Sequence, residues 1–151
     1  MCGIVAYLGP KQAQPLLIEG LKRLEYRGYD SAGLAVLDQQ QIHLARSVGR
    51  VSTLEEMVRG NEALTGSLGI AHTRWATHGS PTESNAHPHT DSTQSIALVH
   101  NGIIENYSAL RTWLEQRGHT FYSETDTEVL AKLIGELYQR DGLDLEAAVQ
   151  A

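Results

Sequence analysis

The residue with the clearest chemical potential is Cys2, the only cysteine among the 151 residues. If the initiator methionine is removed, one residue carries both a thiol and a free α-amine. An α-amine has a pKa of about 7.7–8.0, so it can act as the general base for its own thiol at neutral pH. The alternative is a small buried hydrophobic residue at the start of a strand, the usual role of a single cysteine. The terminal position and the Gly3-Ile4-Val5 that follows favour a nucleophile.

A second candidate, the pair Asn101-Gly102, follows an apolar stretch over residues 96–99 and His100. The pair could form an oxyanion hole, with the Asn101 amide and the Gly102 backbone N–H as donors. Asn-Gly is also a strong signal for a type I′ hairpin turn, and spacing alone favours that turn. Both interpretations stay open from the residues alone.

Arg74 and Asp126 are the charged residues best placed to hold a small substrate. Arg74 leaves a predicted strand and enters a loop, where its guanidinium can bind a carboxylate through two hydrogen bonds. Asp126 lies in the first turn of a predicted helix, where an acidic side chain also simply complements the helix dipole. Arg74 has an equally ordinary interpretation as a surface arginine beside a partly buried Trp75. An arginine and an aspartate together would suit a zwitterionic amino acid, but the sequence does not show that they meet.

Five of the seven histidines fall within residues 72–100, which invites a metal-site interpretation. His87-Pro88-His89 lacks the ligand spacing of a helix, and no second Cys/His pair completes a tetrahedral set. The glycines match neither G-x-G-x-x-G nor G-x-x-x-x-G-K, so no dinucleotide or P-loop site is predicted. We therefore expect no metal and no cofactor, and a histidine-based metal domain is the weakest of the alternatives.

The elements that must position these residues predict an α+β fold. Two S/T-x-x-E capping boxes, beginning at Ser52 and Thr125, predict two of the helix starts. Strands that follow one another without helices between them argue against a doubly wound parallel sheet, so mainly antiparallel sheets are expected. A helical pattern from residue 144 has no end signal, which suggests that the chain stops within an element. Strands are expected over residues 3–8, 32–37, 42–48, 67–73 and 95–100, a long loop over 74–93, and helices over 12–25, 52–60, 106–117 and 125–140.

Composition and charge narrow the class of protein. The chain is 41% hydrophobic and 20% charged, with a net charge of −6, which indicates one globular domain over residues 1–151. There is no basic stretch for nucleic acid and no run of about 18 apolar residues to span a membrane. A single cysteine and the lack of a secretory signal pattern predict a cytoplasmic protein.

Six segments together resemble the glutaminase domain of class II glutamine amidotransferases, which are N-terminal nucleophile hydrolases. They are residues 1–5, 23–33, 71–79, 85–89, 100–106 and 123–128, in family order along nearly the whole chain. The resemblance is closest to the branch of the family that makes glucosamine 6-phosphate. Amidophosphoribosyltransferases are less similar around Tyr26 to Ser31. The resemblance implies a four-layer αββα sandwich that normally continues well beyond residue 151, so that this chain would be an incomplete glutaminase domain.

The resemblance also implies a role for each matching residue. Cys2 would attack the side-chain amide of L-glutamine, releasing ammonia and leaving a glutamyl thioester, while its α-amine moves the protons. Asn101 and Gly102 would form the oxyanion hole. Arg74 would hold the α-carboxylate of glutamine and Asp126 its α-ammonium. The remaining implied residues are Trp75, Thr77, His78 and His87 around the pocket, with Arg27 and Gly28 supporting the surroundings of the nucleophile.

The partners implied by the resemblance extend beyond this chain. In the full-length enzyme, ammonia would aminate fructose 6-phosphate on sugar isomerase domains that are absent here, and that enzyme is expected to be a homodimer. No nucleic acid or membrane partner is implied. Two alternatives to this interpretation are a truncated fragment that only binds glutamine and the glutaminase domain of an amidophosphoribosyltransferase.

Overall fold

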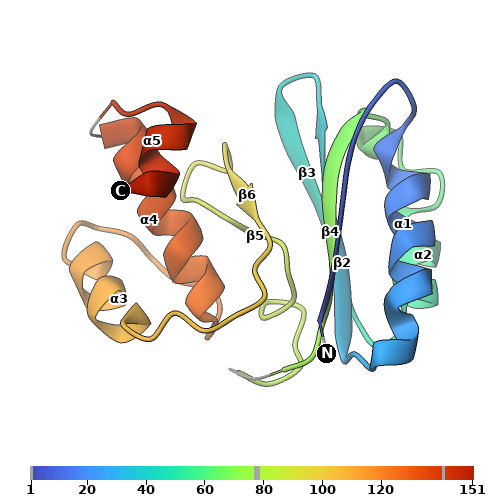
Figure 1. Ribbon diagram of the computed structural model, residues 1–151, viewed down its shortest axis with the longest axis horizontal. Helices are drawn as coiled ribbons and strands as arrows, with labels where there is room; N and C mark the ends of the chain where they lie inside the picture. Colours follow the sequence, from blue (N-terminus) through green and yellow to red (C-terminus); the bar gives the residue numbers. More distant parts are fainter. Residues whose placement is uncertain (1, 77–78, 141) are drawn as a thin grey trace.

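The computed structural model describes residues 2–76, 79–140 and 142–151 and arranges them in four layers (Figure 1). Helices α1 (Ala13–Leu24) and α2 (Val51–Val58) cover one face of a four-stranded sheet. A two-stranded sheet of β5 (His89–Thr90) and β6 (Ala97–Leu98) lies on the other side. Beyond it, α3 (Tyr107–Glu115), α4 (Asp126–Arg140) and α5 (Leu145–Gln150) form the outer layer. The expected α+β class with antiparallel sheets is confirmed.

The register of the larger sheet brings two of the predicted site residues, Cys2 and Arg74, together. Its strand order is β1-β4-β2-β3, from β1 (Gly3–Leu8), β4 (Leu68–Arg74), β2 (Ser31–Asp38) and β3 (Gln41–Val48), with antiparallel pairing throughout. Gly3 pairs with Thr73, so one step further along the register Cys2 comes opposite Arg74. Ser31 of β2 pairs with the same Arg74 from the other side.

The main apolar core lies between the larger sheet and its two covering helices. Side chains of α1 recur on one helical face, as expected for a helix that buries one side. Each fully buried Leu or Val contributes on the order of 1.5–3 kcal/mol relative to exposure, so this layer stabilises the sheet whose edge carries Cys2. The core members are Ala13, Leu17, Ile18 and Leu21 of α1, Val51, Leu54 and Val58 of α2, Leu64, and Ala32, Leu34, Val36 and Ala71 of the sheet.

The opposite face of the sheet lies unusually close to the segment that carries His87. Strand β2 is buried on both faces from Ser31 to Val36. A Cβ added to Gly33 would lie 2.2 Å from the backbone oxygen of His87, which no side chain tolerates. Glycine at position 33 therefore allows this segment to pack directly against the sheet, and it brings the histidines of residues 87–89 to the end of β4.

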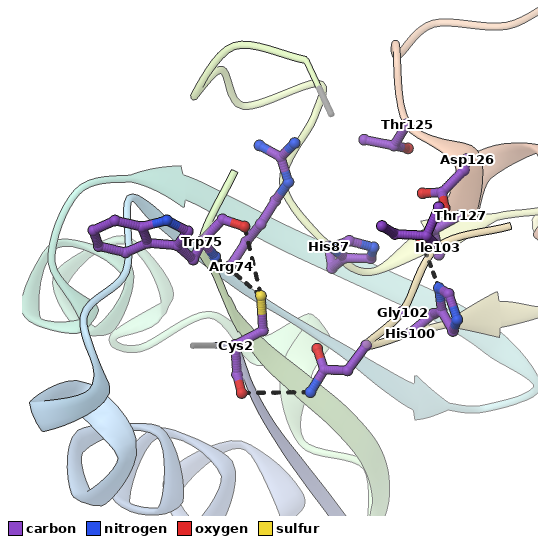
Figure 2. Close-up of a pocket in the computed structure, with 11 residues that line it drawn as sticks. Cys2, Arg74, Trp75, His87, His100, Gly102, Ile103, Thr125, Asp126 and Thr127 are labelled. Atoms are coloured by element: carbon purple, nitrogen blue, oxygen red, sulfur yellow. Dashed lines mark hydrogen bonds between the residues drawn. The ribbon is translucent and has the colours of Figure 1, made fainter. Parts of the chain in front are cut away.

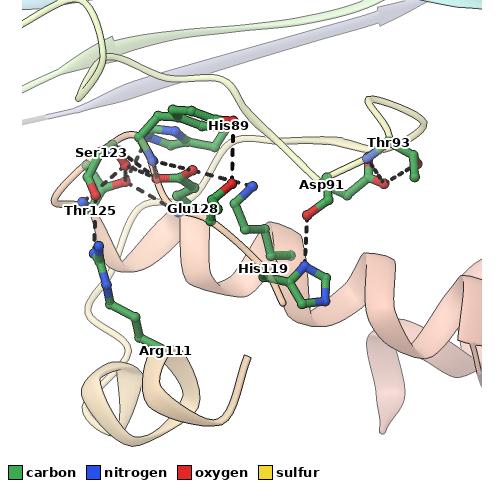
Figure 3. Close-up of polar contacts among 12 residues, drawn as sticks. His89, Asp91, Thr93, Arg111, His119, Ser123, Thr125 and Glu128 are labelled. Carbon is green, nitrogen blue, oxygen red and sulfur yellow. Dashed lines mark hydrogen bonds and ion pairs between the residues drawn. The ribbon is translucent and has the colours of Figure 1, made fainter. Parts of the chain in front are cut away.

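The start of α4 is fixed by a buried hydrogen-bond network around Glu128 (Figure 3). The Glu128 carboxylate accepts the backbone N–H groups of Tyr122 and Ser123 and the Ser123 hydroxyl, at 2.6–3.2 Å. The Thr125 hydroxyl accepts the Glu128 N–H at 3.3 Å and lies 2.9 Å from Nε2 of His89. Lys132 Nζ, 3.5 Å from the carboxylate, supplies an opposite charge. The first turn of α4 is thus held both to β5 and to the loop that precedes α4.

Three expectations about local structure need correction. The capping box at Ser52 is wrong: α2 begins at Val51, whose N–H is accepted by the distant Glu25 carboxylate at 3.0 Å. A tertiary contact therefore replaces the local cap. The strand expected over residues 95–100 is reduced to β6, and its partner β5 lies in the segment predicted as a loop.

The longest described helix, α4, has 15 residues, and no described helix is long and apolar enough to cross a membrane.

Candidate active site

A cavity of about 560 Å³ opens between the end of the larger sheet and the start of α4 (Figure 2). Its size falls within the range of about 300–1,000 Å³ that is typical of small-molecule sites. The walls come from Cys2 just before β1, the end of β4, the segment around His87, the loop after β6 and the first turn of α4. The cavity is therefore assembled from segments that are far apart in the sequence.

Most of the predicted site residues line this cavity, namely Cys2, Arg74, Trp75, His87, Asn101, Gly102 and Asp126. Thr77 and His78 lie outside the described residues. Arg27 does not line the cavity: it is exposed, and its guanidinium lies 5.7 Å from the centre of the Tyr26 ring. Gly28 does not line the cavity either, but a Cβ added to it would lie 3.0 Å from the ring of Trp75, which does.

The Cys2 thiol is held by a backbone peptide rather than buried in a core. Its sulfur accepts the Trp75 N–H at 3.1 Å and lies 3.6 Å from the Trp75 carbonyl oxygen. Cys2 is only partly buried and lines the cavity. The alternative of a buried hydrophobic cysteine is therefore wrong, because Cys2 is of intermediate burial and forms part of the cavity wall.

Asn101 and Gly102 do not form the hairpin turn that their sequence favours. Neither residue has the positive φ that a type I′ turn requires at both central positions, and the next described element is α3 rather than a strand. The Asn101 Oδ1 lies 2.8 Å from Nε2 of His72, and its Nδ2 donates to the Cys2 carbonyl oxygen at 3.4 Å. The amide nitrogen is thus directed toward the residue that carries the thiol, as an oxyanion donor would need to be.

Arg74 and Asp126 are both buried at the cavity wall, at 3% and 5% exposure. The Arg74 guanidinium donates to the carbonyl oxygens of Ser80 (3.4 Å) and Gly79 (3.3 Å) and lies 3.9 Å from the Asp30 carboxylate. The Asp126 Oδ2 accepts the Ile104 N–H at 2.8 Å. Its second oxygen has no hydrogen bond to the described residues and can accept from a ligand. The two opposite charges that the sequence could not connect therefore face one cavity.

Three buried imidazoles lie side by side, and the middle one, His87, lines the cavity. The ring centres of His72 and His87 are 4.3 Å apart, and those of His87 and His89 are 4.8 Å apart. Burial lowers the pKa of His72 to about 4 and that of His89 to about 3, and it also lowers the pKa of His87. All three are therefore neutral at pH 7. Among the described residues, no group of three His, Cys, Asp or Glu side chains is arranged to hold a metal ion.

Several cavity residues were not singled out from the sequence. Thr125 and Thr127 flank Asp126, while His100 and Ile103 flank Asn101-Gly102. His72 touches the site through Asn101, and the alternation of side chains along a strand places it on the same face of β4 as Arg74. That alternation was readable from the sequence and could have identified His72.

Comparisons with known proteins agree with this geometry. A family description of the glutamine amidotransferase domain matches residues 60–146. The chain belongs to the glutamine amidotransferase family. The glutamine–fructose-6-phosphate aminotransferase (isomerizing) of Clostridium perfringens is 54% identical over 144 residues, which cover 95% of this chain and 23% of that protein. The corresponding protein of Thermus thermophilus is 56% identical over 152 aligned positions, with 100% and 25% covered.

Solved structures support the same family fold. The glutamine phosphoribosylpyrophosphate amidotransferase of B. subtilis, complexed with ADP and GMP, aligns with a TM-score of 0.79 at 26% identity. An allosteric regulatory enzyme of purine biosynthesis aligns with a TM-score of 0.81 at 27% identity. Both alignments cover 99% of this chain and 32% of the other. The N-terminal nucleophile amidotransferase fold is thereby confirmed, and the chain spans about a quarter of the length of the aminotransferases that it matches.

The buried histidines predict a steep loss of stability in weak acid. In the unfolded chain a histidine binds its proton near pH 6.5, whereas His72 and His89 resist protonation until about pH 4 and about pH 3. The unfolded state therefore binds more protons below pH 6.5, and each buried imidazole lowers the free energy of unfolding by up to about 1.4 kcal/mol per pH unit. Urea denaturation between pH 7.5 and pH 5 should show this fall.

Two variants test whether the cluster causes the fall. His89→Gln should reduce the slope by about a third, since it removes one of three such groups. Gln41→Ala, on β3 and outside the cluster, removes no titratable group and should leave the slope unchanged. A free energy of unfolding that is constant between pH 7 and pH 5 would contradict the neutral, buried state of these rings.

A second prediction concerns the contact between Gly28 and the indole ring of Trp75. Gly28 has φ of +79°, and an added Cβ would lie 3.0 Å from the Trp75 ring. With ψ of 141° this backbone lies outside the left-handed α region, so Gly28→Ala should cost on the order of 1–3 kcal/mol in backbone strain and also displace the indole. Gly118→Ala is the matched control, because Gly118 has φ of +90° with no atom within 4 Å of the added Cβ. In a Trp113→Phe background, only Gly28→Ala should shift the Trp75 fluorescence; equal spectra for both variants would show that Gly28 does not support the indole.

Proposed function

We propose that this chain hydrolyses the side-chain amide of L-glutamine to glutamate and ammonia, with Cys2 as the nucleophile. The observation that carries the proposal is the convergence of a thiol, an amide donor, a guanidinium and a carboxylate on one cavity. These groups come from Cys2, Asn101, Arg74 and Asp126, on four separate segments. Similarity to glutamine–fructose-6-phosphate aminotransferases supports glutamine as the substrate.

The reaction follows from the positions of these groups. The Cys2 sulfur attacks the amide carbon, a C–S bond forms, and the carbonyl π electrons move to oxygen. The Asn101 Nδ2 and the Gly102 N–H donate hydrogen bonds to that oxygen and stabilise its negative charge. When the C–N bond breaks, the nitrogen takes a proton and leaves as ammonia. Water then cleaves the thioester, which releases glutamate and restores the thiol.

The proton transfers need a base beside the sulfur. Once Met1 is removed, the α-amine of Cys2 has a pKa suited to accepting the thiol proton and delivering it to the leaving nitrogen. Arg74 binds the α-carboxylate of glutamine and Asp126 its α-ammonium. Trp75, Thr77, His78 and His87 complete the pocket, while Arg27 and Gly28 support the surroundings of the nucleophile.

The longer protein is also part of the proposal. We propose that residues 1–151 form the front of a larger glutaminase domain, in a cytoplasmic, homodimeric enzyme whose isomerase domains use the ammonia to aminate fructose 6-phosphate. The shared name of relatives at 54–56% identity supports this acceptor over that of the phosphoribosylpyrophosphate amidotransferase, which is 26% identical. An apolar cavity of about 280 Å³ between the larger sheet, β6 and α5 supports further covering segments.

The test of the function is glutamate release by the purified chain and its labelling by a diazoketone analogue of glutamine. With Met1 removed, the chain should hydrolyse glutamine and bind one equivalent of the analogue, as measured by intact mass spectrometry. Cys2→Ala should do neither, because no other cysteine can form the thioester. A chain that retains Met1 should lose the activity, since its α-amine belongs to another residue. Labelling that persists in Cys2→Ala would end the assignment, and a chain that binds glutamine without hydrolysing it would favour the binding-fragment alternative.

The clamp for the amino-acid end of glutamine predicts a specific loss of affinity. Asp126→Asn keeps an oxygen for the Ile104 N–H and removes only the charge, so glutamine binding should weaken by about 2–5 kcal/mol with little change in stability. Arg74→Lys should also bind weakly, because a lysine cannot reproduce the planar guanidinium. Asp144→Asn is the matched control: Asp144 accepts the Ala147 N–H at the start of α5, outside the cavity. Calorimetric titration with glutamine that shows no difference between Asp126→Asn and Asp144→Asn would refute the clamp.

A further inference from the structure

We propose that His72 is a positioning residue, which holds the Asn101 side-chain amide with its nitrogen toward the nucleophile. The catalytic consequence rests on the proposed function, but the orientation of the amide does not. His72 lies in β4 and is 1% exposed, whereas Asn101 lies on an exposed loop 29 positions later. A rigid strand residue thus controls a group on a loop.

The contacts of the Asn101 amide impose a single orientation. Its Oδ1 lies 2.8 Å from the His72 Nε2, and its Nδ2 lies 3.4 Å from the Cys2 carbonyl oxygen. A carbonyl oxygen can only accept, so the amide group facing Cys2 must be the NH₂. The Asn101 oxygen also can only accept, so the His72 Nε2 must carry a hydrogen. Rotating the amide by 180° would place two acceptors together at Cys2, and with the hydrogen of His72 on Nε2 it would also place two donors together at His72.

The His72 ring is itself prevented from turning. On the strand it is flanked by Ile4 of β1 and Gly33 of β2, and the His87 ring packs on it with a centre-to-centre distance of 4.3 Å. The His87 backbone is in turn pressed against the sheet at Gly33. The Nε2–H therefore points from a crowded, buried position, and the loop that carries Asn101 is ordered against it before any substrate arrives.

This placement matters because an oxyanion donor is effective only when it is oriented in advance. An Asn101 amide free to rotate would present its oxygen to the developing negative charge for part of the time. The contact with His72 removes that state. It does so without proton transfer by His72, which distinguishes this role from that of a general base.

The experiment compares two amide substitutions at one position. The amide nitrogen of His72→Gln can occupy the place of Nε2, whereas the shorter side chain of His72→Asn cannot reach Asn101. In the chain with Met1 removed, His72→Asn should lower kcat for glutamine hydrolysis by about 10–100-fold with little change in KM, below the 10²–10³-fold expected for Asn101→Ala. His72→Gln should recover most of the loss. His72→Phe, which has no donor, should behave like His72→Asn.

A double variant separates positioning from a general effect on structure. If His72 acts through Asn101, His72→Asn combined with Asn101→Ala should be no slower than Asn101→Ala alone. A further 10-fold fall in the double variant would overturn the proposal. Urea denaturation of each variant identifies any that fail to fold, and His72→Gln keeps the comparison available if His72→Phe is unstable.

A second measurement does not depend on glutaminase activity. In ¹⁵N-labelled protein, the Asn101 NH₂ signal, assigned by its loss in Asn101→Ala, should show one ordered environment with two distinct proton shifts. In His72→Asn its shifts should move toward those of a mobile amide, and in His72→Gln they should return. An unchanged signal in His72→Asn would refute the positioning role, whereas a fully inactive parent chain would refute only the proposed function.

Discussion

The arrangement of the site depends on the antiparallel pairing of β1 with β4. This pairing places Gly3 opposite Thr73, and the Thr73 hydroxyl accepts the Gly3 N–H at 3.1 Å. The residue before Gly3 therefore comes opposite Arg74, and its sulfur reaches the Trp75 peptide. Because side chains alternate along a strand, a shift of the register by one residue would turn the side chains of β1 to the opposite faces of the sheet and remove Cys2 from the cavity.

Burial of neutral imidazoles is the energetic cost of this arrangement. Packing His72, His87 and His89 against one another excludes water from the back of the cavity and lowers their pKa values. Neither ring nitrogen of His87 has a hydrogen-bond partner among the described residues. Such a group costs on the order of 1–3 kcal/mol. Because His87 lines the cavity, a bound molecule could form the hydrogen bonds that its ring nitrogens lack. An unpaired buried polar group at such a position points to a binding site.

The two halves of the site are held by different forces. The Cys2 side rests on a sheet stabilised by the apolar core under α1 and α2. The Asp126 side rests on a polar network, in which Glu128 accepts two backbone N–H groups and a hydroxyl. His89 joins the two by its contact with Thr125. The distance between Arg74 and Asp126, which are proposed to bind the carboxylate and the ammonium group of the substrate, is thus set by a polar contact between layers and not by the apolar core.

The sequence by itself determined the elements and the chemical types at the site. Hydrophobic periodicity and helix end signals are local, so the positions of β1, β2, β3, β4 and the helices could be predicted closely. Residue type and position singled out Cys2, Arg74, Asn101 and Asp126 as candidates, and the family resemblance assigned each of them its role. Asn101-Gly102 shows the limit of local reasoning, because its turn propensity was overridden by contacts with His72 and Cys2.

Only the tertiary structure decided which of these residues meet. The capping of Val51 by Glu25, the approach of His87 to Gly33 and the contact of His72 with Asn101 all join residues at least 26 positions apart. No local pattern encodes such contacts, since they arise when strand register and layer packing bring separate segments together. The residue types of the site could therefore be predicted from local sequence, whereas the orientation of its groups is set by packing between layers.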